Sequence, residues 1–437
     1  MKIQTPPGMR DFYPDQMRLQ NWLFDQWRGV SRAFGFEEYE GPIFEFLELY
    51  RLKSGEGIVS ELFHFRDRGE REFAIRPEMT PTLARMVAAR ANALPRPIKW
   101  FSIPRMCRAE RPQRGRLREF FQWNIDILGA EDALADAECI AVAAEFFRGI
   151  GLSAADIAIR ISTRPLARAV LQSLGLPAEQ TDAAFPLIDR FEKLDAAEFR
   201  RQWDERLGAS VPSGRVDECL RGLSRPDALE LAARCGADGE AAALEVERLW
   251  SSLSGLGVAD YCEFDLRIVR GLAYYTGAVF EAHSRKASLR ALLGGGRYDD
   301  LTSLLDGPKL PGVGFGAGDA PMTELLTELN RLPALDRQLD VFVIDTEAEL
   351  FHDALGLAGR LREQRLSVDF SYRRAAIGKQ LKQADARGAR FVVLVGRDYQ
   401  SQRRVEVKEL GSGAQWAVNA DELCRNPAAC LAVPRSV

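Results

Sequence analysis

A helical stretch of about ninety residues interrupts a sequence that otherwise favours β-strands, and this interruption limits the possible folds most. Between Pro165 and about Gly257 the chain is rich in Ala, Leu, Glu and Arg and poor in β-branched residues, a composition that predicts helices. Residues 36–129 carry short β-type runs between charged loops, and strand-like, glycine-rich sequence resumes over residues 278–316. We therefore expect the helices to form an insertion inside one β-containing domain.

Hydrophobic spacing predicts further elements on both sides of the insertion. Asp15 is the expected cap of a helix that ends at Gly35, and helical spacing returns over residues 133–148. After a linker around Leu332, strands and helices alternate. Their predicted order is strand 340–345, helix 350–365, strand 367–372, helix 377–387 and strand 391–395. Such alternation indicates a separate α/β domain of about 100 residues.

Composition excludes several classes of protein. The 437 residues are about three times the usual length of a domain, which predicts two to three domains. A net charge of −4 excludes a wholly basic nucleic-acid binder. The seven cysteines form no CxxC pair and the three histidines lie far apart, so no zinc ribbon, disulfide framework or other metal site is predicted. The chain starts without a signal-peptide pattern and has no run of ~18 apolar residues, which predicts a reduced, soluble, cytoplasmic protein without a membrane partner.

Six arginines crowd residues 105–118, a loop between predicted strands at 99–103 and 121–128. Few acidic residues neutralise them. Their planar guanidinium groups suit phosphate oxygens, so the loop is a candidate phosphate-binding element. The alternative is a solvated charged hairpin.

The strand after this loop favours a binding role. Strand alternation places Gln122, Asn124 and Asp126 on one face. The opposite face is apolar and holds Phe121, Trp123, Ile125 and Ile127. A sheet with one such polar row predicts a polar pocket. The glycine-rich stretches at 294–296 and 312–318 match neither GxGxxG before a helix nor GxxxxGK[ST], so neither a Rossmann site nor a P-loop is predicted.

Four stretches resemble motifs of one enzyme family, the histidyl-tRNA synthetases of class II. Residues 105–126 resemble motif 2, residues 40–45 motif 1 and residues 76–80 the substrate-amine loop. Residues 269–281 resemble the peptide specific to histidine enzymes. The resemblance covers nearly the whole chain, with the motifs in the family's order.

The resemblance implies an α+β fold, with an antiparallel class II sheet flanked by helices. The implied domains are a catalytic domain at 1–164 and 258–331, a helical insertion at 165–257, and a C-terminal α/β anticodon-binding domain at 338–437. A homodimer is also implied, because motif 1 builds the dimer interface in the family.

Carried over by position, the resemblance implies how ATP is bound. Arg108 and Arg270 would be catalytic, clamping the α-phosphate from opposite sides. The implied ATP-binding residues are Arg108, Glu110, Arg116, Phe120 and Arg270. Mg²⁺ would bridge the β- and γ-phosphates.

The histidine-binding residues follow in the same way. Glu78, Thr80 and Gln122 would accept hydrogen bonds from the ammonium group, while Asp126 and Tyr275 would hold the two imidazole nitrogens. The full implied set is Glu78, Met79, Thr80, Gln122, Asp126, Tyr274, Tyr275 and Tyr298. Taken singly, Tyr274 and Tyr275 fit an ordinary core pair, Glu78 could cap a helix at 80–86, and Arg270 could lie on the surface. Their joint presence favours the site.

The tRNA is the second implied substrate, and no DNA partner is expected. Gln113 and Arg118 are candidates for its acceptor end. Arg373, Arg374 and Lys379 belong to a basic stretch of the C-terminal domain that fits RNA phosphates.

One departure concerns motif 3, where the family has Glu and Arg and this chain has Ala320 and Pro321. Either Arg114, Arg116 or Arg118 compensates, or ATP binds weakly, or the chain is a non-catalytic relative. We favour compensation, because the histidine-contacting positions are filled.

The resemblance therefore implies a histidine–tRNA ligase, which forms histidyl-adenylate from ATP and histidine and then charges tRNA. One alternative is a histidine-binding regulatory paralogue of a biosynthetic phosphoribosyltransferase, which would not aminoacylate tRNA. Another is an RNA-binding scaffold that senses uncharged tRNA.

Overall fold

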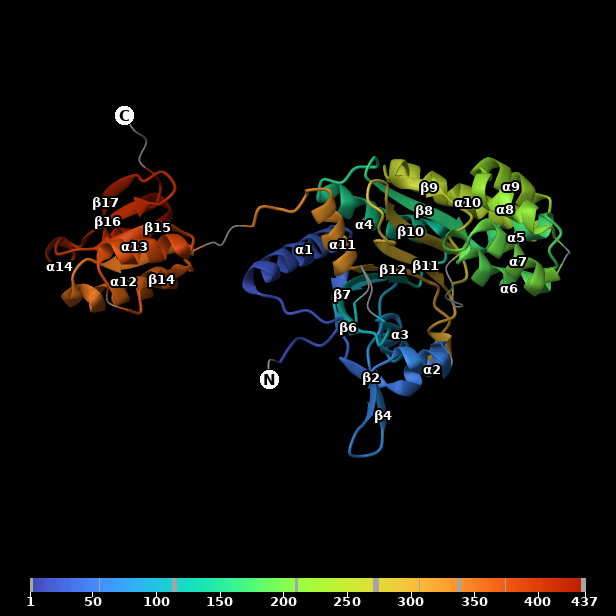
Figure 1. Cartoon of the computed structure of the whole chain (residues 1–437), viewed down its shortest axis with the longest axis horizontal. Helices are drawn as coiled ribbons and strands as arrows, with labels where there is room; N and C mark the ends of the chain where they lie inside the picture. Colours follow the sequence, from blue (N-terminus) through green and yellow to red (C-terminus); the bar gives the residue numbers. More distant parts are fainter. Residues whose placement is uncertain are drawn as a thin grey trace. The chain divides into compact units, whose positions relative to one another are not determined.

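The computed structural model describes residues 3–54, 56–111, 115, 117–208, 211–269, 275–305, 307–335, 339–373 and 375–433, the side chains of 53, 54 and 56–58 excepted. Contacts divide the chain into two compact units, Met1–Leu332 and Pro333–Val437, each visible in Figure 1. The boundary falls at the predicted linker. Among the described residues, no helix combines the length and apolar character needed to cross a membrane.

The first unit is built on a large sheet, which has nine strands within the described residues. The inner neighbours pair antiparallel, whereas β1–β5 and β8–β9 at the two edges are parallel. The predicted α+β class with an antiparallel sheet is confirmed. In sheet order the strands are β1 (Glu37–Glu38), β5 (Ile98–Ser102), β7 (Glu119–Leu128), β12 (Gly312–Gly318), β11 (Leu293–Tyr298), β10 (Ala278–Ser284), β8 (Ile157–Thr163) and β9 (Cys262–Phe264), with β6 (Arg105–Cys107) also pairing with β7.

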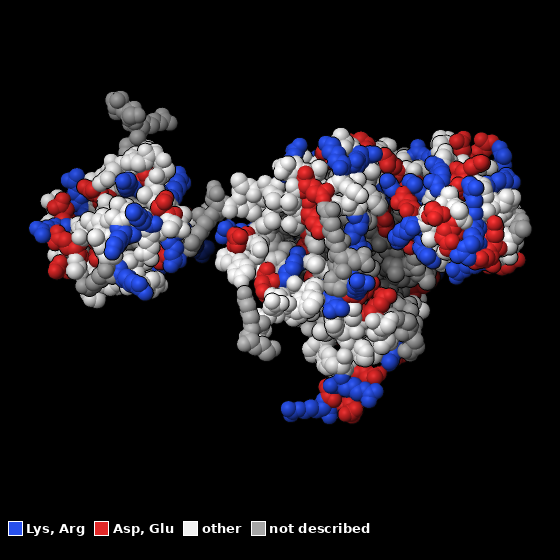
Figure 2. Space-filling model, viewed as in Figure 1, with Lys and Arg blue, Asp and Glu red and all other residues white. Residues whose placement is uncertain are grey.

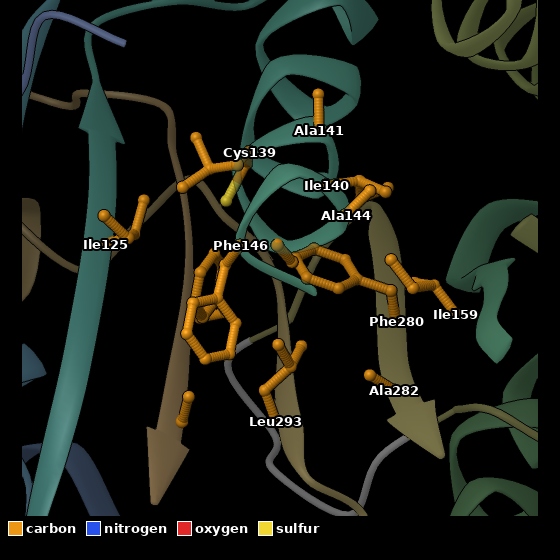
Figure 3. Close-up of a cluster of buried hydrophobic side chains, with 14 of the residues drawn as sticks. Ile125, Cys139, Ile140, Ala141, Ala144, Phe146, Ile159, Phe280, Ala282 and Leu293 are labelled. Carbon is orange, nitrogen blue, oxygen red and sulfur yellow. The ribbon is translucent and has the colours of Figure 1, made fainter. Parts of the chain in front are cut away.

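Helices α1 (Pro14–Ala33) and α4 (Ala133–Gly149) cover one face of this sheet. Strand β7 directs Trp123 toward them, where its ring stacks on Trp27 at a centroid distance of 5.8 Å and its indole N–H donates to Ser31 Oγ at 3.0 Å. Figure 3 shows side chains of α4 meeting Ile125 and Phe280 from the sheet. The apolar half of the predicted alternation in β7 therefore forms the main core.

Smaller elements lie toward the other face. Helix α3 (Thr80–Ala88) packs Leu83 and Val87 with Tyr298 in a second cluster. A three-stranded antiparallel sheet, β2 (Phe44–Phe46), β4 (Glu72–Ile75) and β3 (His64–Arg66), lies next to α2 (Leu47–Ser54). The β-type runs predicted over residues 36–129 are interrupted by α2, which was not predicted, and by α3, which corresponds to the helix at 80–86 that Glu78 could cap. Their short apolar runs are too brief to separate helix from strand by periodicity alone.

The stretch predicted to be helical forms six α-helices within its described residues, together with short 3-10 turns. It has its own apolar core, which includes Val170, Trp203 and Leu220. The last helix also packs against α4, so the insertion belongs to the first unit. The helices are α5 (Arg164–Ser173), α6 (Thr181–Ile188), α7 (Ala196–Leu207), α8 (Ser213–Gly222), α9 (Arg225–Ala233) and α10 (Ala237–Gly255), and α11 (Asp319–Glu328) follows β12 at the end of the unit.

The second unit has a five-stranded sheet with helices packed against it. The predicted strands and helices are present as β13 (Leu339–Asp345), α12 (Phe351–Glu363), β14 (Val368–Phe370), α13 (Ile377–Ala386) and β15 (Ala389–Val395). The antiparallel strands β16 (Arg404–Glu409) and β17 (Gln415–Asn419) extend the sheet and were not predicted. Three short helices complete the unit: α14 (Asp398–Gln402), α15 (Ala420–Arg425) and α16 (Pro427–Cys430).

Candidate functional site

A cavity of about 240 Å³ opens on the face of the large sheet opposite α4. Polar side chains of β7 form part of its wall, because every second residue of this strand points away from the apolar core. The described residues that line it include Glu78, Thr80, Arg108, Phe120, Gln122, Asn124, Asp126, Tyr275, Glu281, Arg290, Tyr298, Gly314, Gly316, Ala320 and Pro321. The polar pocket predicted from strand alternation is confirmed.

Glycines of β12 leave room for the polar row of β7. Gly314 is the register partner of Asp126, and a Cβ atom on Gly314 would lie 2.2 Å from Asp126 Oδ1. A Cβ atom on Gly316 would lie 2.7 Å from Gln122 Cδ. Both distances are far below van der Waals contact, so side chains on these glycines would displace the polar groups from the cavity.

Asp126 and two tyrosines belong to the buried part of the cavity wall. Asp126 Oδ1 accepts a hydrogen bond from the Tyr298 hydroxyl. Tyr275 also lines the cavity, and all three residues are buried. A buried wall with one carboxylate and two phenol groups offers both acceptors and donors to a small heteroaromatic ligand.

The loop before α3 brings Glu78 and Thr80 to the same cavity. Arg76 holds this loop, because its guanidinium donates to Glu40 Oε1 at 2.5 Å and to Arg105 O at 3.0 Å. Glu40, from the stretch that resembles motif 1, and Arg105, from the stretch that resembles motif 2, therefore hold the loop that carries Glu78.

Arg108 contributes a positive charge from the end of β6. Its Nε donates to Pro77 O at 3.0 Å, and its guanidinium carbon lies 5.1 Å from the centre of the Phe120 ring. The two contacts fix the plane of the guanidinium, which prepares it to bind a planar or tetrahedral oxyanion.

A buried ion pair between β11 and α4 supports the wall of the cavity. Arg297 of β11 reaches Asp136 of α4 with Nη2 and Oδ2 3.0 Å apart, and it also donates to the carbonyl of Ala130 at 3.0 Å. Burial raises the pKa of the Asp136 carboxyl to about 7, and the charge of Arg297 opposes this rise. The pair links β11, which carries Tyr298, to the helix on the opposite face.

Eight of the predicted site residues line the one cavity: Glu78, Thr80, Arg108, Phe120, Gln122, Asp126, Tyr275 and Tyr298. Met79 does not, because its side chain is fully buried with Sδ 3.9 Å from an Arg76 nitrogen. Glu110 and Arg118 are not among the lining residues, and Arg118 Nε donates to Glu110 O at 3.1 Å. Arg373 and Lys379 are exposed in the second unit. Gln113, Arg114, Arg116, Arg270, Tyr274 and Arg374 lie outside the described residues.

Arg290 also lines the cavity, although it was not among the predicted site residues. It lies three residues before β11 and close to the glycine run that this strand contains. No family motif in the sequence includes Arg290, so only its position just before the glycine run could have suggested a role. The glycines of β12 were noted, but their alternation with the polar row of β7 became visible only from the strand pairing.

Comparisons with known proteins agree with this arrangement. The family model described as histidyl-tRNA synthetase matches residues 8–318, and the anticodon binding domain model matches residues 338–426. A histidine–tRNA ligase of Opitutus terrae is 40% identical over 96% of this chain and 97% of its own length. The chloroplastic/mitochondrial histidine–tRNA ligase of Arabidopsis thaliana is 38% identical over 96% of this chain and 86% of its own length.

A solved structure shows the same likeness in three dimensions. The crystal structure of histidyl-tRNA synthetase from Nostoc matches with a TM-score of 0.81 and 27% identity, covering 98% of this chain and all of that one. The fold, the cavity and these full-length matches have one common explanation: the chain belongs to the histidyl-tRNA synthetase family.

Proposed function

We propose that this chain is a histidine–tRNA ligase. It activates histidine with ATP to give histidyl-adenylate and pyrophosphate, and then transfers the histidyl group to the 3′ end of its tRNA. The observation that carries the proposal is the convergence of Glu78, Gln122, Asp126, Tyr275 and Arg108 on one cavity. Relatives named histidine–tRNA ligase that align over nearly the whole chain support it.

Histidine fits the acidic part of the cavity. Glu78, with Thr80 and Gln122, supplies oxygen acceptors for an ammonium group. Asp126 accepts from one imidazole nitrogen and Tyr275 binds the other. Analogues without these nitrogens would lose the hydrogen bonds that Asp126 and Tyr275 make to the imidazole, which is how such a site rejects them. Tyr274 and Tyr298 complete the proposed wall, and the buried Met79 is proposed to support the loop that carries Glu78 and Thr80.

ATP fits beside histidine, next to Arg108. In the first step a histidine carboxylate oxygen attacks the α-phosphorus, and the bond to the β,γ-pyrophosphate breaks. Arg108 stabilises the negative charge that develops on the α-phosphate oxygens, and Arg270 is the proposed partner cation. Phe120 offers a stacking surface for adenine, with Glu110 and Arg116 as further nucleotide contacts. No covalent enzyme intermediate is required, since the site acts by positioning and charge stabilisation.

Mg²⁺ is the proposed metal, bound to the β- and γ-phosphates. Mg²⁺ in nucleotide sites usually takes one or two carboxylates plus substrate phosphates. Glu281 lines the cavity and fits this part. Among the described residues, no group of three or more His, Cys, Asp or Glu side chains is arranged to hold a metal ion. We therefore expect the ion to enter with ATP and to neutralise charge on the leaving pyrophosphate.

The second unit is the proposed anticodon-binding domain. Figure 2 shows Lys and Arg side chains over the face on which Figure 1 labels α13. Within the described part of the chain, Arg373, Lys379 and Lys382 have no acidic partner at ion-pair distance, whereas Arg397 pairs with Glu347. Cations without an acidic partner suit RNA phosphates. Arg374 is a further proposed contact there, and Gln113 and Arg118 are proposed for the acceptor end.

The proposed assembly is a homodimer formed through the small sheet. Phe44, Phe46 and Phe65 of β2 and β3 are exposed, and their rings contact one another or Phe73. In Figure 2 the surface over β2 is uncharged, while the tip of the β3–β4 hairpin carries charged side chains. An exposed aromatic cluster of this kind marks an association surface, and motif 1 runs through β2.

The domains follow the same proposal. Residues 1–164 and 258–331 would catalyse activation, residues 165–257 would form the insertion, and residues 338–437 would read the anticodon. The separate apolar cores of the insertion and of the second unit support this division. We place the protein in the cytoplasm, which its seven cysteines outside disulfides support.

Histidine-dependent ATP–pyrophosphate exchange, followed by charging of histidine tRNA, tests the proposal. Exchange is expected with histidine and not with other amino acids. Absence of exchange at saturating ATP would remove the enzymatic claim. Copurification with a phosphoribosyltransferase, without tRNA charging, would instead support the regulatory alternative. That alternative is less supported, because the relatives that align over both units are named as ligases.

A further inference from the structure

The cavity ends near the first turn of α11, where Ala320 and Pro321 line its wall. Neither side chain is charged, and the sequence holds no arginine between Phe315 and Asn330. We infer that Arg290, from the adjacent connection, binds the terminal phosphates of ATP at this end. The inference rests on the proposed function, since it assigns part of the same ATP site.

Strand pairing brings Arg290 to the end of the cavity that Ala320 lines. The β11–β12 ladder begins with Leu293 opposite Ala317. Arg290 lies three residues before Leu293, and Ala320 lies three residues after Ala317, so the two positions leave the ladder at the same end. Both residues line the cavity, which is the direct evidence that they face one space.

The arginine-rich loop meets Arg290 at this point. Gly115 of that loop has φ +68°, and a Cβ atom built on it would lie 3.2 Å from Arg290 Cδ and 3.5 Å from Glu324 Oε2. The Arg290 stem therefore lies close to both the loop after β6 and helix α11. The contact places this cation next to the loop whose guanidinium groups suit phosphate.

The charge of the cavity also requires a second cation. Among the described lining residues the cations are Arg108 and Arg290, whereas Glu78, Asp126 and Glu281 are acidic. Arg108 is held by Pro77 O and by the Phe120 ring, which leaves it at one place along the triphosphate. Without Arg290, the described wall would present three carboxylates and one cation to a highly anionic ligand.

An arginine suits this position better than a lysine. Its planar fork donates two parallel hydrogen bonds to phosphate oxygens, and its length lets a backbone position beside Ala320 reach the cavity. Of the three arginines expected to compensate for motif 3, Arg118 does not line the cavity, and Arg114 and Arg116 lie outside the described residues. Arg290 was not among those candidates.

Calorimetric titration with ATP tests the inference on the full chain. Arg290→Ala is expected to raise the Kd for ATP roughly tenfold or more, as for loss of a charge-assisted hydrogen bond. The Kd values for AMP, which lacks the terminal phosphates, and for histidine should stay unchanged. Arg285→Ala is the matched control, because it removes the same charge from the same connection without lining the cavity. Arg290→Lys should recover part of the ATP affinity.

Other results would overturn the inference. An ATP Kd equal to that of Arg285→Ala would show that Arg290 does not bind ATP. Equal weakening of ATP and AMP would place the contact on the nucleoside, and loss of histidine binding would show that Arg290 merely shapes the cavity. The proposed function is tested separately. Wild-type protein that binds ATP but gives no histidine-dependent exchange would contradict the proposed function and would not contradict the role of Arg290.

Discussion

The Tyr298 hydroxyl of β11 donates a hydrogen bond to the Asp126 carboxylate of β7, across the intervening strand β12. Gly312 and Gly314 of β12 lie opposite Tyr298 and Asp126, respectively, and have no side chains to separate them. The contact fixes one carboxylate oxygen at the buried end of the cavity. Its direction depends on three strands that are distant in sequence.

Asp126→Asn should selectively weaken histidine use. The amide has the shape of the carboxylate but no negative charge, so KM for histidine should rise roughly 10- to 100-fold. Tyr298→Phe should give a smaller rise, because it only loosens the Asp126 side chain. ATP–pyrophosphate exchange, with one substrate varied at a time, measures the KM for histidine and the KM for ATP. A variant with an altered KM for ATP and an unchanged KM for histidine would contradict the assignment.

Gly314→Ala should remove histidine binding through its added methyl group. The new Cβ would lie 2.2 Å from Asp126 Oδ1 and 2.5 Å from Ile125 O, so Asp126 must move or the strands must separate. Overpacking of this kind typically costs ~1–3 kcal/mol of unfolding free energy. Calorimetry with histidine and thermal unfolding measure the two effects. Gly149→Ala is the control, because a Cβ there meets no atom within 4 Å; equal histidine affinity in both variants would refute the role of Gly314.

Replacing Lys379 and Lys382 together by Ala should reduce tRNA charging. Both lie on α13 in the second unit, whereas the cavity residues belong to the first unit. The kcat/KM for tRNA should fall, and its dependence on salt should become weaker, because fewer phosphates are neutralised. ATP–pyrophosphate exchange should not change. Arg397→Ala serves as the control, since Arg397 already pairs with Glu347; an equal loss in that variant would argue against a specific surface on α13.

Phe46→Asp with Phe65→Asp should convert the proposed dimer to monomers. Their side chains are 53% and 42% exposed, so charges there cost little in the isolated chain but disrupt an apolar interface. Sedimentation velocity at micromolar concentration measures the mass. Leu244→Asp on α10 is the matched control, because Leu244 is 53% exposed. A double variant that retains the wild-type mass would place any dimer interface elsewhere.

Asp156 should make the first unit acid-sensitive. Hydrogen bonds from Lys286 Nζ at 2.5 Å and from the Ser153 N–H at 2.9 Å lower the pKa of Asp156 from 3.8 to about 2. Since the folded-state pKa lies below the unfolded value, the stabilisation is present above about pH 4 and is lost as the pH falls toward 2.

Urea unfolding of wild type and Asp156→Asn at pH 7 and pH 3 tests this dependence. The variant should be less stable by about 1–2 kcal/mol at pH 7, and the difference should shrink at pH 3. Asp340→Asn in the second unit is a control outside the pair. The same difference in unfolding free energy at both pH values would show that the charge of Asp156 does not stabilise the folded state.

The local character of each segment could be predicted from the amino-acid sequence. The 2-residue period of β7 separated Trp123 and Ile125 from Gln122 and Asp126, because strand geometry sends neighbouring side chains to opposite faces. The composition of residues 165–257 predicted helices for the same local reason. The family motifs supplied ligand roles, which no period or composition contains. Short elements such as α2, β16 and β17 were missed, since a few residues give too little periodicity to distinguish their structure.

Which distant residues share the cavity depends on strand pairing and could not be predicted from local sequence. Asp126 meets Tyr298 through the pairing of β7, β12 and β11, and Glu78 joins them through the hydrogen bonds of Arg76. Arg290 belongs to no motif considered in the sequence, and its place follows from where the β11–β12 ladder begins. The physical reason is that backbone hydrogen bonding sets strand register between distant segments. Register, more than the local sequence of a strand, decides which side chains face one another.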